Sequence, residues 1–497
     1  MSEKNINNPE EDAHVPEKAH DVAADADDAP SDSKASKRGV RTSHKVLIAA
    51  AVLAMALVTV GVAALLVNIN QRQQEAHTPF FNVVELDETT TDPEIWGQNF
   101  PLQFESYKRT LLMEEGSHGG SEALPAVLDP DDPRADTKSP QKLELDPRLV
   151  NMWKGYAFSV DYRELRGHAY MLHDQRMTER VQQFDQPGAC LNCHASLPAL
   201  WNDLGDGDIE AGWHEMNAMS FDEANELVDH PISCIDCHDP ATMQLRVTRP
   251  AFEKGIAAAK LAEEGIKDYD VNRDASASEM RTFVCAQCHV EYYFAGDEKT
   301  LTFPWANGLT IDDAYEYYDE VEFNDWTHEL TGAPMLKAQH PEFEMWNQGV
   351  HASSGVTCAD CHMPYEREGA MKISDHQVTS PLKNVNSSCL TCHSGTEEEM
   401  LAKVDQIQDR HVHTRSMAQD ALDDLIDDIV DARDAGATDA DLADAWEYQR
   451  KASFYIDYVV SENSLGFHAP GESLRILGDA ADAARKGQLA LHELGED

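Results

Sequence analysis

The ten cysteines of this 497-residue chain are the residues whose spacing most clearly implies chemistry. They form five pairs in which two residues separate the cysteines, and a histidine directly follows each pair. Two thiols at this spacing can form thioether bonds with the vinyl groups of one haem, and the histidine can ligate the iron from the same side. Each motif is therefore a candidate attachment site for a c-type haem. The motifs are Cys190, Cys193 and His194; Cys234, Cys237 and His238; Cys285, Cys288 and His289; Cys358, Cys361 and His362; and Cys389, Cys392 and His393.

Other uses of paired cysteines fit this pattern poorly. A structural zinc site needs four ligands and requires no histidine after each pair. A redox-active pair normally occurs once, near a βαβ unit, and disulfides would leave the five histidines unexplained. The sequence therefore predicts five covalently bound haems, with the five motif histidines as proximal iron ligands.

Acidic residues dominate the charge of the chain. There are 90 Asp and Glu against 40 Lys and Arg, which gives a formal net charge of −50. Nucleic-acid binding needs clustered Lys and Arg, so we expect no nucleic acid among the partners. An anionic substrate would need a locally basic route into such a protein. Because 42% of the residues are hydrophobic, the chain can bury a core.

An apolar segment lies near the N-terminus. Residues 46–67 form a 22-residue run without charge, which as a helix would span ~33 Å, enough for a bilayer. The polar, acidic residues 1–45 before it predict a disordered tail. Basic residues at the end of this tail place it in the cytoplasm. They are Lys34, Lys37, Arg38, Arg41 and Lys45.

A buried core helix and a cleaved signal peptide are alternatives for this segment. We favour an uncleaved transmembrane signal-anchor, because the run is long for a signal peptide and the leader before it is also long. The chain after about residue 68 would then lie on the extracytoplasmic side, in the periplasm or at the cell surface. This location suits the attachment of c-type haem.

The rest of the chain divides into three regions. Residues 68–150 are expected to form a stalk and an N-terminal lobe, with a loop or insertion over residues 115–141. Residues 151–395 hold all five motifs and show no sustained strand alternation, so we expect helices and loops around haems. Residues 396–497 are expected to be helical.

Three segments in this last region have helical periodicity: residues 416–435, 439–460 and 472–494. They predict long antiparallel helices with breaks at Gly436 and Gly466. The expected fold class is therefore mainly α: a multihaem cytochrome c core with little β structure, long C-terminal helices and one N-terminal transmembrane helix.

Haem iron needs axial ligands, so the other histidines were counted. An electron-transfer haem usually has two protein ligands, whereas a catalytic haem needs an open position. Of the 22 histidines, five are proximal and three precede the apolar segment, which leaves 22 − 5 − 3 = 14. The count does not say which of these fourteen are distal ligands.

Several segments resemble the pentahaem, ammonia-forming cytochrome c nitrite reductases. The resemblance covers about residues 150–480, and it is specific because the matching segments lie both at and between the haem motifs. They are VCAQCHVEYYF at 284–294, PMLKAQHP at 334–341, Arg166-Gly-His168, Pro187-Gly-Ala-Cys190, Asp375-His376 and His468-Ala-Pro470.

The resemblance implies distal ligands for four of the haems. It assigns His168 to the Cys285 haem, His376 to the Cys234 haem, His468 to the Cys358 haem and His351 to the Cys389 haem. The haem at Cys190 would have none, which leaves one open iron. Most members of the family have lysine as the proximal ligand of this haem. Here that residue is His194, as in a minority of members, so we expect its redox tuning to differ.

The resemblance also implies a distal pocket over the first haem, made of Arg180, Tyr292 and His340. Arg180 is a permanent cation that can hold an anion. His340 can donate hydrogen bonds and protons, and Tyr292 offers a hydroxyl. Taken singly, Arg180 could pair at a surface, Tyr292 could stack on a haem and His340 could be a turn residue.

A calcium ion beside this pocket is a further implication of the resemblance. Its ligands would be the Glu291 carboxylate, the Gln339 amide oxygen and the backbone carbonyls of Tyr292 and Lys337. Oxygen ligands suit a hard cation. The alternative is that Glu291 is one more acid in an acidic protein.

The implied function is the six-electron reduction of nitrite to ammonium at one open haem, fed by four bis-histidine haems. The implied partners are a membrane-bound, quinol-oxidising multihaem cytochrome as electron donor and a second copy of the chain, bound through the C-terminal helices. Two alternatives stay open: a non-catalytic multihaem electron-transfer protein, and the same fold acting mainly on hydroxylamine or sulfite. If a spare histidine such as His173 or His214 closed the first haem, the chain would be an electron relay.

Overall fold

The computed structural model describes residues 38–76, 82–111, 115–120, 138–369 and 371–494. The chain divides into two compact units, residues 1–77 and residues 78–497, and each is described by itself. Residues 1–37 of the predicted tail lie outside the described residues.

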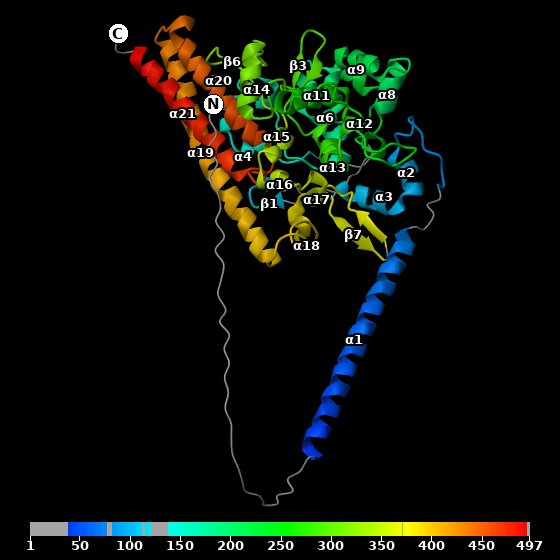
Figure 1. Cartoon of the computed structure of the whole chain (residues 1–497). Helices are drawn as coiled ribbons and strands as arrows, with labels where there is room; N and C mark the ends of the chain where they lie inside the picture. Colours follow the sequence, from blue (N-terminus) through cyan, green and yellow to red (C-terminus); the bar gives the residue numbers. More distant parts are fainter. Residues whose placement is uncertain (1–37, 77–81, 112–114, 121–137, 370, 495–497) are drawn as a thin grey trace, which may run out of the picture. The chain divides into compact units, whose positions relative to one another are not determined.

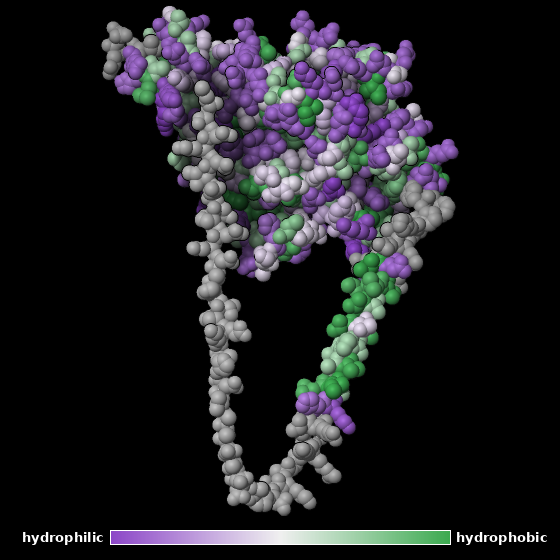
Figure 2. All heavy atoms as spheres, in the orientation of Figure 1, coloured by the Kyte–Doolittle hydropathy of each residue, from purple (hydrophilic) through white to green (hydrophobic). Residues whose placement is uncertain are grey.

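The described part of the first unit is one helix, α1 (Arg38–Ala76). Its segment His44–Asn70 is long and apolar enough to cross a membrane. The apolar side chains along it are exposed, Leu53 by 64% and Leu57 by 66%, and Figure 2 shows the helix as a largely hydrophobic rod. A helix that is apolar on every side suits a bilayer. α1 therefore contains the predicted apolar segment, and it has the character of a membrane anchor or a signal sequence.

The second unit is mainly helical, as predicted, and its visible face is mostly hydrophilic (Figure 2). Its α-helices are α2 (Pro93–Asn99), α3 (Pro101–Lys108), α4 (Lys142–Leu145), α5 (Arg148–Met152), α6 (Met171–Met177), α7 (Glu179–Gln183), α8 (Pro198–Leu204), α9 (Ile209–Ala218), α10 (Phe221–Asn225), α11 (Pro250–Glu264), α12 (Val271–Asp274), α13 (Ala277–Ala286), α14 (Ile311–Glu320), α15 (Glu342–Asn347), α16 (Val350–Ser353), α17 (Cys358–His362), α18 (Val385–Ser388), α19 (Glu397–Asp434), α20 (Asp439–Ser461) and α21 (Pro470–Leu494).

Short 3-10 helices and strands complete the described part of this unit. The 3-10 helices are η1 (Arg109–Leu111), η2 (Ala157–Ser159), η3 (His168–Tyr170), η4 (Gly188–Asn192), η5 (Cys234–Asp236) and η6 (Pro381–Asn384). The strands pair as antiparallel hairpins: β1 (Glu115–Gly116) with β2 (Gly119–Gly120), β3 (Tyr293–Ala295) with β4 (Thr300–Thr302), β5 (Trp326–Thr327) with β6 (Pro334–Met335), and β7 (Tyr365–Glu368) with β8 (Met371–Ser374). The predicted loop at 115–141 thus begins with the β1–β2 hairpin, and its residues 121–137 lie outside the described ones.

The C-terminal helices α19, α20 and α21 pack side by side along one edge of the unit (Figure 1). Breaks at Gly436 and Gly466 separate them, as predicted, and both glycines have positive φ, 102° and 80°. α19 begins at Glu397, well before the predicted residue 416. Charged residues surround this first half of the helix, which weakens its apolar period, and a capping box between Thr396 and Glu399 starts it.

Two buried clusters hold the unit together. One cluster combines the C-terminal helices with segments that precede and follow the third haem motif, and it contains Trp153, Leu336, Leu425, Phe454 and Ile476. The other surrounds the first three motifs and contains Leu191, Trp201, Trp213, Phe252 and Phe283. Segments that are far apart in sequence are thereby brought to the haem motifs.

Candidate active site

The first haem motif lies on η4 and is held tightly against the turn that follows α9. The Gly188 N–H donates to the Met219 carbonyl at 2.8 Å. A Cβ atom at Gly188 would lie 2.4 Å from the Met216 carbonyl oxygen, so only glycine fits here. This close approach fixes the backbone just before Cys190.

Four of the five motif histidines face a second histidine, and in each case it is the one that the family resemblance assigned. The separations between ring centroids are 6.2 Å for His168 and His289, 6.3 Å for His238 and His376, 6.1 Å for His351 and His393, and 6.3 Å for His362 and His468.

This spacing is what an iron atom between two imidazoles requires. Centroids of two rings that ligate one metal from opposite sides lie roughly 6 Å apart, since each metal–nitrogen bond is about 2.0 Å and each nitrogen is about 1.2 Å from its ring centre. Two rings that merely stack or meet edge-on would adopt a wider range of separations, from 4.5 to 7 Å. The residues around these four motifs therefore fit bis-histidine haems.

Hydrogen bonds orient the candidate ligand rings. The Nδ1 atoms of His194, His238, His362 and His376 lie 2.8 to 3.1 Å from backbone carbonyl oxygens. A carbonyl only accepts, so Nδ1 carries the proton and Nε2 keeps its lone pair for a metal. Two further rings meet carboxylates instead: His468 bonds to Glu462, and His289 Nδ1 lies 3.6 Å from Glu342.

His194 differs from the other motif histidines, because among the described residues no ring contact joins it to a second histidine. The two spare histidines considered above lie against other groups. The ring of His173 is 6.5 Å from that of Tyr170. His214 lies 4.5 Å from the Trp213 ring, and its side chain is 41% exposed.

Arg180, Tyr292 and His340 gather around the first motif instead. Burial lowers the pKa of His194 to about 4, and the positive charge of Arg180 acts in the same direction. Burial raises the pKa of Tyr292 well above its usual value, and Arg180 opposes that rise. Burial lowers the pKa of His340 to about 3, and the His194 ring is among the groups that act on it. Three separate segments thus bring a cation, a phenol and a neutral imidazole to residues of the first motif, the cation and the imidazole to His194 and the phenol to Cys190 and Cys193.

The predicted calcium ligands also lie together. Glu291 is fully buried, and its carboxylate accepts from the Tyr318 hydroxyl at 2.9 Å and the Gln339 N–H at 2.7 Å. The Gln339 side-chain amide is 3.5 Å from the Lys337 carbonyl oxygen. The Lys337 ammonium is used elsewhere, in an ion pair of 2.8 Å with Asp457.

This donor set of one carboxylate, one amide oxygen and backbone carbonyls fits a hard cation. Burial raises the pKa of Glu291 well above its usual value. A bound cation would favour the ionised carboxylate instead. The described residues contain no group of three or more His, Cys, Asp or Glu side chains that could hold a metal ion. The predicted calcium site has a single carboxylate, so it is a different kind of site.

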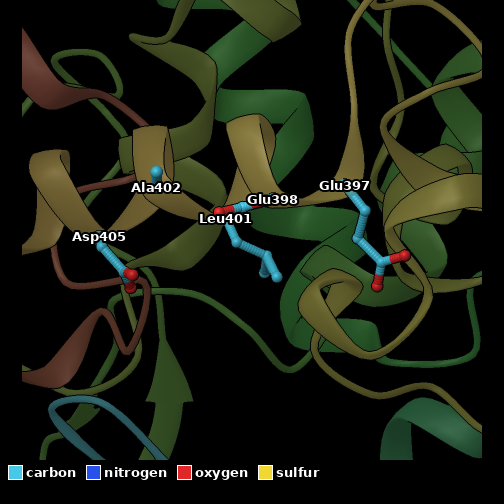
Figure 3. A pocket seen from close by; sticks show the side chains of 5 residues that line it. All are labelled: Glu397, Glu398, Leu401, Ala402 and Asp405. Atoms are coloured by element: carbon cyan, nitrogen blue, oxygen red, sulfur yellow. The ribbon is translucent and has the colours of Figure 1, made fainter.

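One open depression of the surface lies at the start of α19 and is shown in Figure 3. Its lining contains none of the predicted site residues. The lining residues are Glu397, Glu398, Leu401, Ala402 and Asp405.

The sequence profile of the cytochrome c552 family matches residues 92–496. This chain belongs to the cytochrome c552 family. It is 37% identical to cytochrome c-552 of Bacteroides fragilis over 437 residues, which cover 86% of this chain and 82% of that protein. It is 40% identical to cytochrome c-552 of Parabacteroides distasonis over 356 residues, which cover 70% and 69% of the two chains.

A solved structure has a similar fold. It is the catalytic subunit of cytochrome c nitrite reductase from Desulfovibrio desulfuricans, described with two calcium sites. The TM-score is 0.68 and the identity 31%, over 82% of this cytochrome c552 chain and 88% of that chain. These matches confirm the resemblance inferred from the sequence, and family membership supports haem c as a cofactor of this cytochrome c552.

Proposed function

We propose that this cytochrome c552 reduces nitrite to ammonium in a six-electron reaction at the first haem motif. The observation that carries the proposal is the asymmetry among the motifs. Four motif histidines face another histidine at 6.1–6.3 Å, whereas no second histidine ring faces His194 among the described residues. Arg180 and His340 instead interact electrostatically with His194, and Tyr292 with the two cysteines of that motif. The similarity to a solved nitrite reductase supports the same conclusion.

The chain would hold five haems through its ten motif cysteines, with four pairs of histidines and the single His194 as axial ligands. When bound, the four bis-histidine haems supply electrons and the first haem supplies an open iron position for the substrate. His194, anchored through Nδ1 to the Met171 carbonyl at 3.0 Å, would present Nε2 to that iron.

Arg180 binds the anion in this proposal. Its guanidinium carries a permanent charge and a fork of N–H donors that suits two oxygens. None of the ion pairs recorded for the described residues involves Arg180, so its charge is available within a chain of net charge −50.

His340 and Tyr292 handle the substrate oxygens. With a pKa of about 3, because of burial, His340 is neutral near neutral pH and offers one N–H donor and one acceptor nitrogen. It would therefore relay protons, with the N–H donating to an oxygen as the other ring nitrogen accepts the next proton, rather than act as a standing imidazolium. The Tyr292 hydroxyl would donate to the same oxygens, each of which leaves as water once protonated.

Calcium would brace the two segments that carry these groups. Glu291 precedes Tyr292, and Gln339 precedes His340. The direct bond from the Gln339 N–H to the Glu291 carboxylate already links the two segments, and a cation between their oxygens would stiffen that link.

The location and partners follow from the same proposal. α1 would serve as an uncleaved anchor that holds the second unit on the extracytoplasmic side. There the protein would take electrons from a membrane-bound, quinol-oxidising multihaem cytochrome. A second copy of the chain would bind through the C-terminal helices.

The test is an assay on the haem-loaded full chain in detergent, with a reduced viologen dye as donor and ammonium as the measured product. Stoichiometric ammonium from nitrite, and one high-spin haem among four low-spin haems by electron paramagnetic resonance, would support the proposal. Five low-spin haems that are inert to cyanide would indicate an electron relay. A much higher kcat/KM for hydroxylamine or sulfite than for nitrite would indicate the related activity.

A further inference from the structure

The guanidinium of Arg180 is held by two side chains outside the predicted pocket. It lies over the ring of Phe158, at 4.2 Å from the ring centroid. Its Nε donates a hydrogen bond of 3.2 Å to the Thr178 hydroxyl oxygen. The contact with the Phe158 ring sets the plane of the guanidinium, and the hydrogen bond to Thr178 sets its rotation within that plane.

The direction of the Thr178 hydroxyl is itself determined. This hydroxyl donates its proton to Asp161 at 2.8 Å, so its lone pairs are left to accept from Arg180. Asp161 is 0% exposed and cannot turn away. It accepts from the Gln141 amide at 2.8 Å and pairs with Arg163 at 2.7 Å. A buried chain of bonds therefore ends on the Nε of Arg180.

The Phe158 ring is fixed as well. Tyr156 stacks on it, with centroids 5.6 Å apart and an angle of 8°, and Trp326 stacks on Tyr156 at 4.6 Å. Trp153 meets Phe158 edge-on at 6.0 Å. An aromatic ring packed in this way gives a rigid face for a cation.

A second cation, Lys337, lies over the same ring at 4.6 Å. The Lys337 ammonium forms an ion pair of 2.8 Å with the buried Asp457 carboxylate. Among the described residues, no acidic side chain forms an ion pair with Arg180. Of the two cations on this ring, only Arg180 keeps its charge free for an external anion.

These contacts leave a defined part of the guanidinium for a ligand. Of its five N–H donors, Nε uses one, and the four on Nη1 and Nη2 remain. Together they form a fork that matches a small planar anion with two oxygens. We propose that Thr178 and Phe158 are positioning residues that aim this fork at the first haem motif, and that they thereby set the preference for nitrite over uncharged substrates. This inference rests on the proposed function.

A positioning role for Thr178 and Phe158 predicts different effects on charged and uncharged substrates, whereas a general structural role predicts equal effects. Nitrite carries a negative charge, so its binding depends on where the guanidinium is held. Hydroxylamine in its neutral form gains little from a fixed cation. Loosening Arg180 should therefore weaken nitrite binding and leave hydroxylamine turnover nearly unchanged.

The experiment uses the haem-loaded full chain with Thr178→Val, which keeps the shape of the side chain and removes the hydroxyl, and with Phe158→Leu, which removes the aromatic face. KM and kcat are measured for nitrite and for hydroxylamine with the viologen donor, and nitrite binding is measured by optical titration of the oxidised protein. We expect the nitrite KM and Kd to rise about tenfold, the value of one hydrogen bond to a charged group. We expect the hydroxylamine constants to change by less than about twofold.

Two further variants serve as controls. Thr178→Ser restores the hydroxyl and should restore the nitrite KM. Thr438→Val removes a comparable N-cap hydroxyl, that of α20, without any recorded contact to Arg180, and should leave both substrates unaffected. If nitrite and hydroxylamine kinetics fall together in Thr178→Val and Phe158→Leu, the positioning role is wrong.

Arg180→Gln separates a failure of this inference from a failure of the proposed function. If Arg180→Gln raises the nitrite KM strongly but both positioning variants leave it unchanged, Arg180 binds nitrite without help from Thr178 and Phe158, and only the inference falls. If Arg180→Gln also leaves the nitrite KM unchanged, the proposed anion site falls, and the inference falls with it. If Thr178→Val fails to retain haem, Phe158→Leu still gives a decision.

Discussion

The first haem motif and the other four share one local sequence pattern but have different surroundings. Opposite His238, His289, His362 and His393, another imidazole lies 6.1–6.3 Å away. Near His194 the protein provides a cation and a neutral imidazole that act on its charge, and a phenol that acts with the two motif cysteines. Under the proposed function, the motif determines where a haem would be attached, and the residues around it determine whether that haem could react.

The proximal sides of the motifs are more alike. His194 Nδ1 bonds to a backbone carbonyl at 3.0 Å, and so do His238 at 3.1 Å and His362 at 3.0 Å. Anchoring of the proximal ring therefore does not distinguish the candidate catalytic motif. The difference between the two regions is the second histidine, which four motif histidines have and which His194 lacks among the described residues.

Replacing His194 tests the first region most directly. His194→Ala removes the sole protein ligand proposed for that iron, so we expect nitrite turnover and the high-spin signal to be lost while four low-spin haems remain. Activity assays and electron paramagnetic resonance measure the two effects. His194→Lys is the matched control, because lysine can still ligate the iron and should keep the open position. Undiminished turnover in His194→Ala would place the reaction at another haem.

His340→Asn should have the next largest effect on nitrite turnover. Asparagine keeps a hydrogen-bonding group but cannot relay protons, so ammonium formation should fall by roughly 10²–10⁴, the range for a general acid. Haem content and the low-spin bands should not change. If kcat for nitrite stays at the wild-type value, His340 has no part in proton delivery.

Removing calcium tests whether a bound cation stabilises the two segments that carry Tyr292 and His340. Glu291→Gln keeps the shape of the side chain and removes the charged ligand, and we expect turnover to fall by about 10- to 100-fold, as for other groups that support a site. Chelation of the wild-type protein should have the same effect, and added calcium should reverse it in the wild type only. Metal analysis that finds no calcium in active protein would contradict the proposed site.

His351→Ala asks whether an open iron is enough to make a motif reactive. This change should convert the fifth motif into a second open site, so cyanide should bind two haems instead of one. The ring contacts of His351 are with His393 and Phe467, at 6.1 and 5.9 Å, with no cation among them. We therefore expect little change in nitrite turnover with a dye donor. A marked gain in turnover would show that the open iron matters more than its polar surroundings.

Glu462→Gln should produce the smallest change, in the potential of one haem. The buried Glu462 carboxylate bonds to Nδ1 of His468 and should stabilise the ferric state of the haem at Cys358. Removing its charge should raise the potential, by ~59 mV for each tenfold change in a one-electron equilibrium. A redox titration followed optically measures this shift. Ser464→Ala is the control: it removes a hydrogen bond to Glu462 and one that the His468 N–H donates, but it leaves the carboxylate charge in place, so it should shift the potential less.

Features of the fold and of the candidate site that depend on neighbouring residues were predictable from single segments of the sequence. The haem motifs, the apolar run within α1 and the glycine breaks at 436 and 466 each depend on a few neighbouring residues. The periodicity predicts a helix only from residue 416, whereas α19 begins at Glu397, because residues 397–415 carry many charges and their apolar period is weak. The capping box at Thr396 and Glu399 was the signal that could have located it.

Residues that act through long-range contacts had no such signal. Thr178 and Phe158 hold Arg180, and Glu462 holds His468, yet none of them belongs to a motif. Thr178 could have been noticed as the residue that caps α7. The bond that its hydroxyl accepts from Arg180, and the bond that it donates to Asp161, are visible only in the folded chain.

From local patterns the sequence predicts five haem attachment motifs, a proximal histidine after each of them, and one apolar segment long enough to span a bilayer. These properties depend on covalent chemistry and on hydrophobicity along a short stretch, so they do not require knowledge of the fold. The residues near a motif do not specify what faces it: the pairing of His168 with His289 was implied only by the family resemblance, and the folded chain shows the two rings together. They approach one another because buried clusters bring distant segments together, and contacts of that kind arise from packing rather than from local sequence.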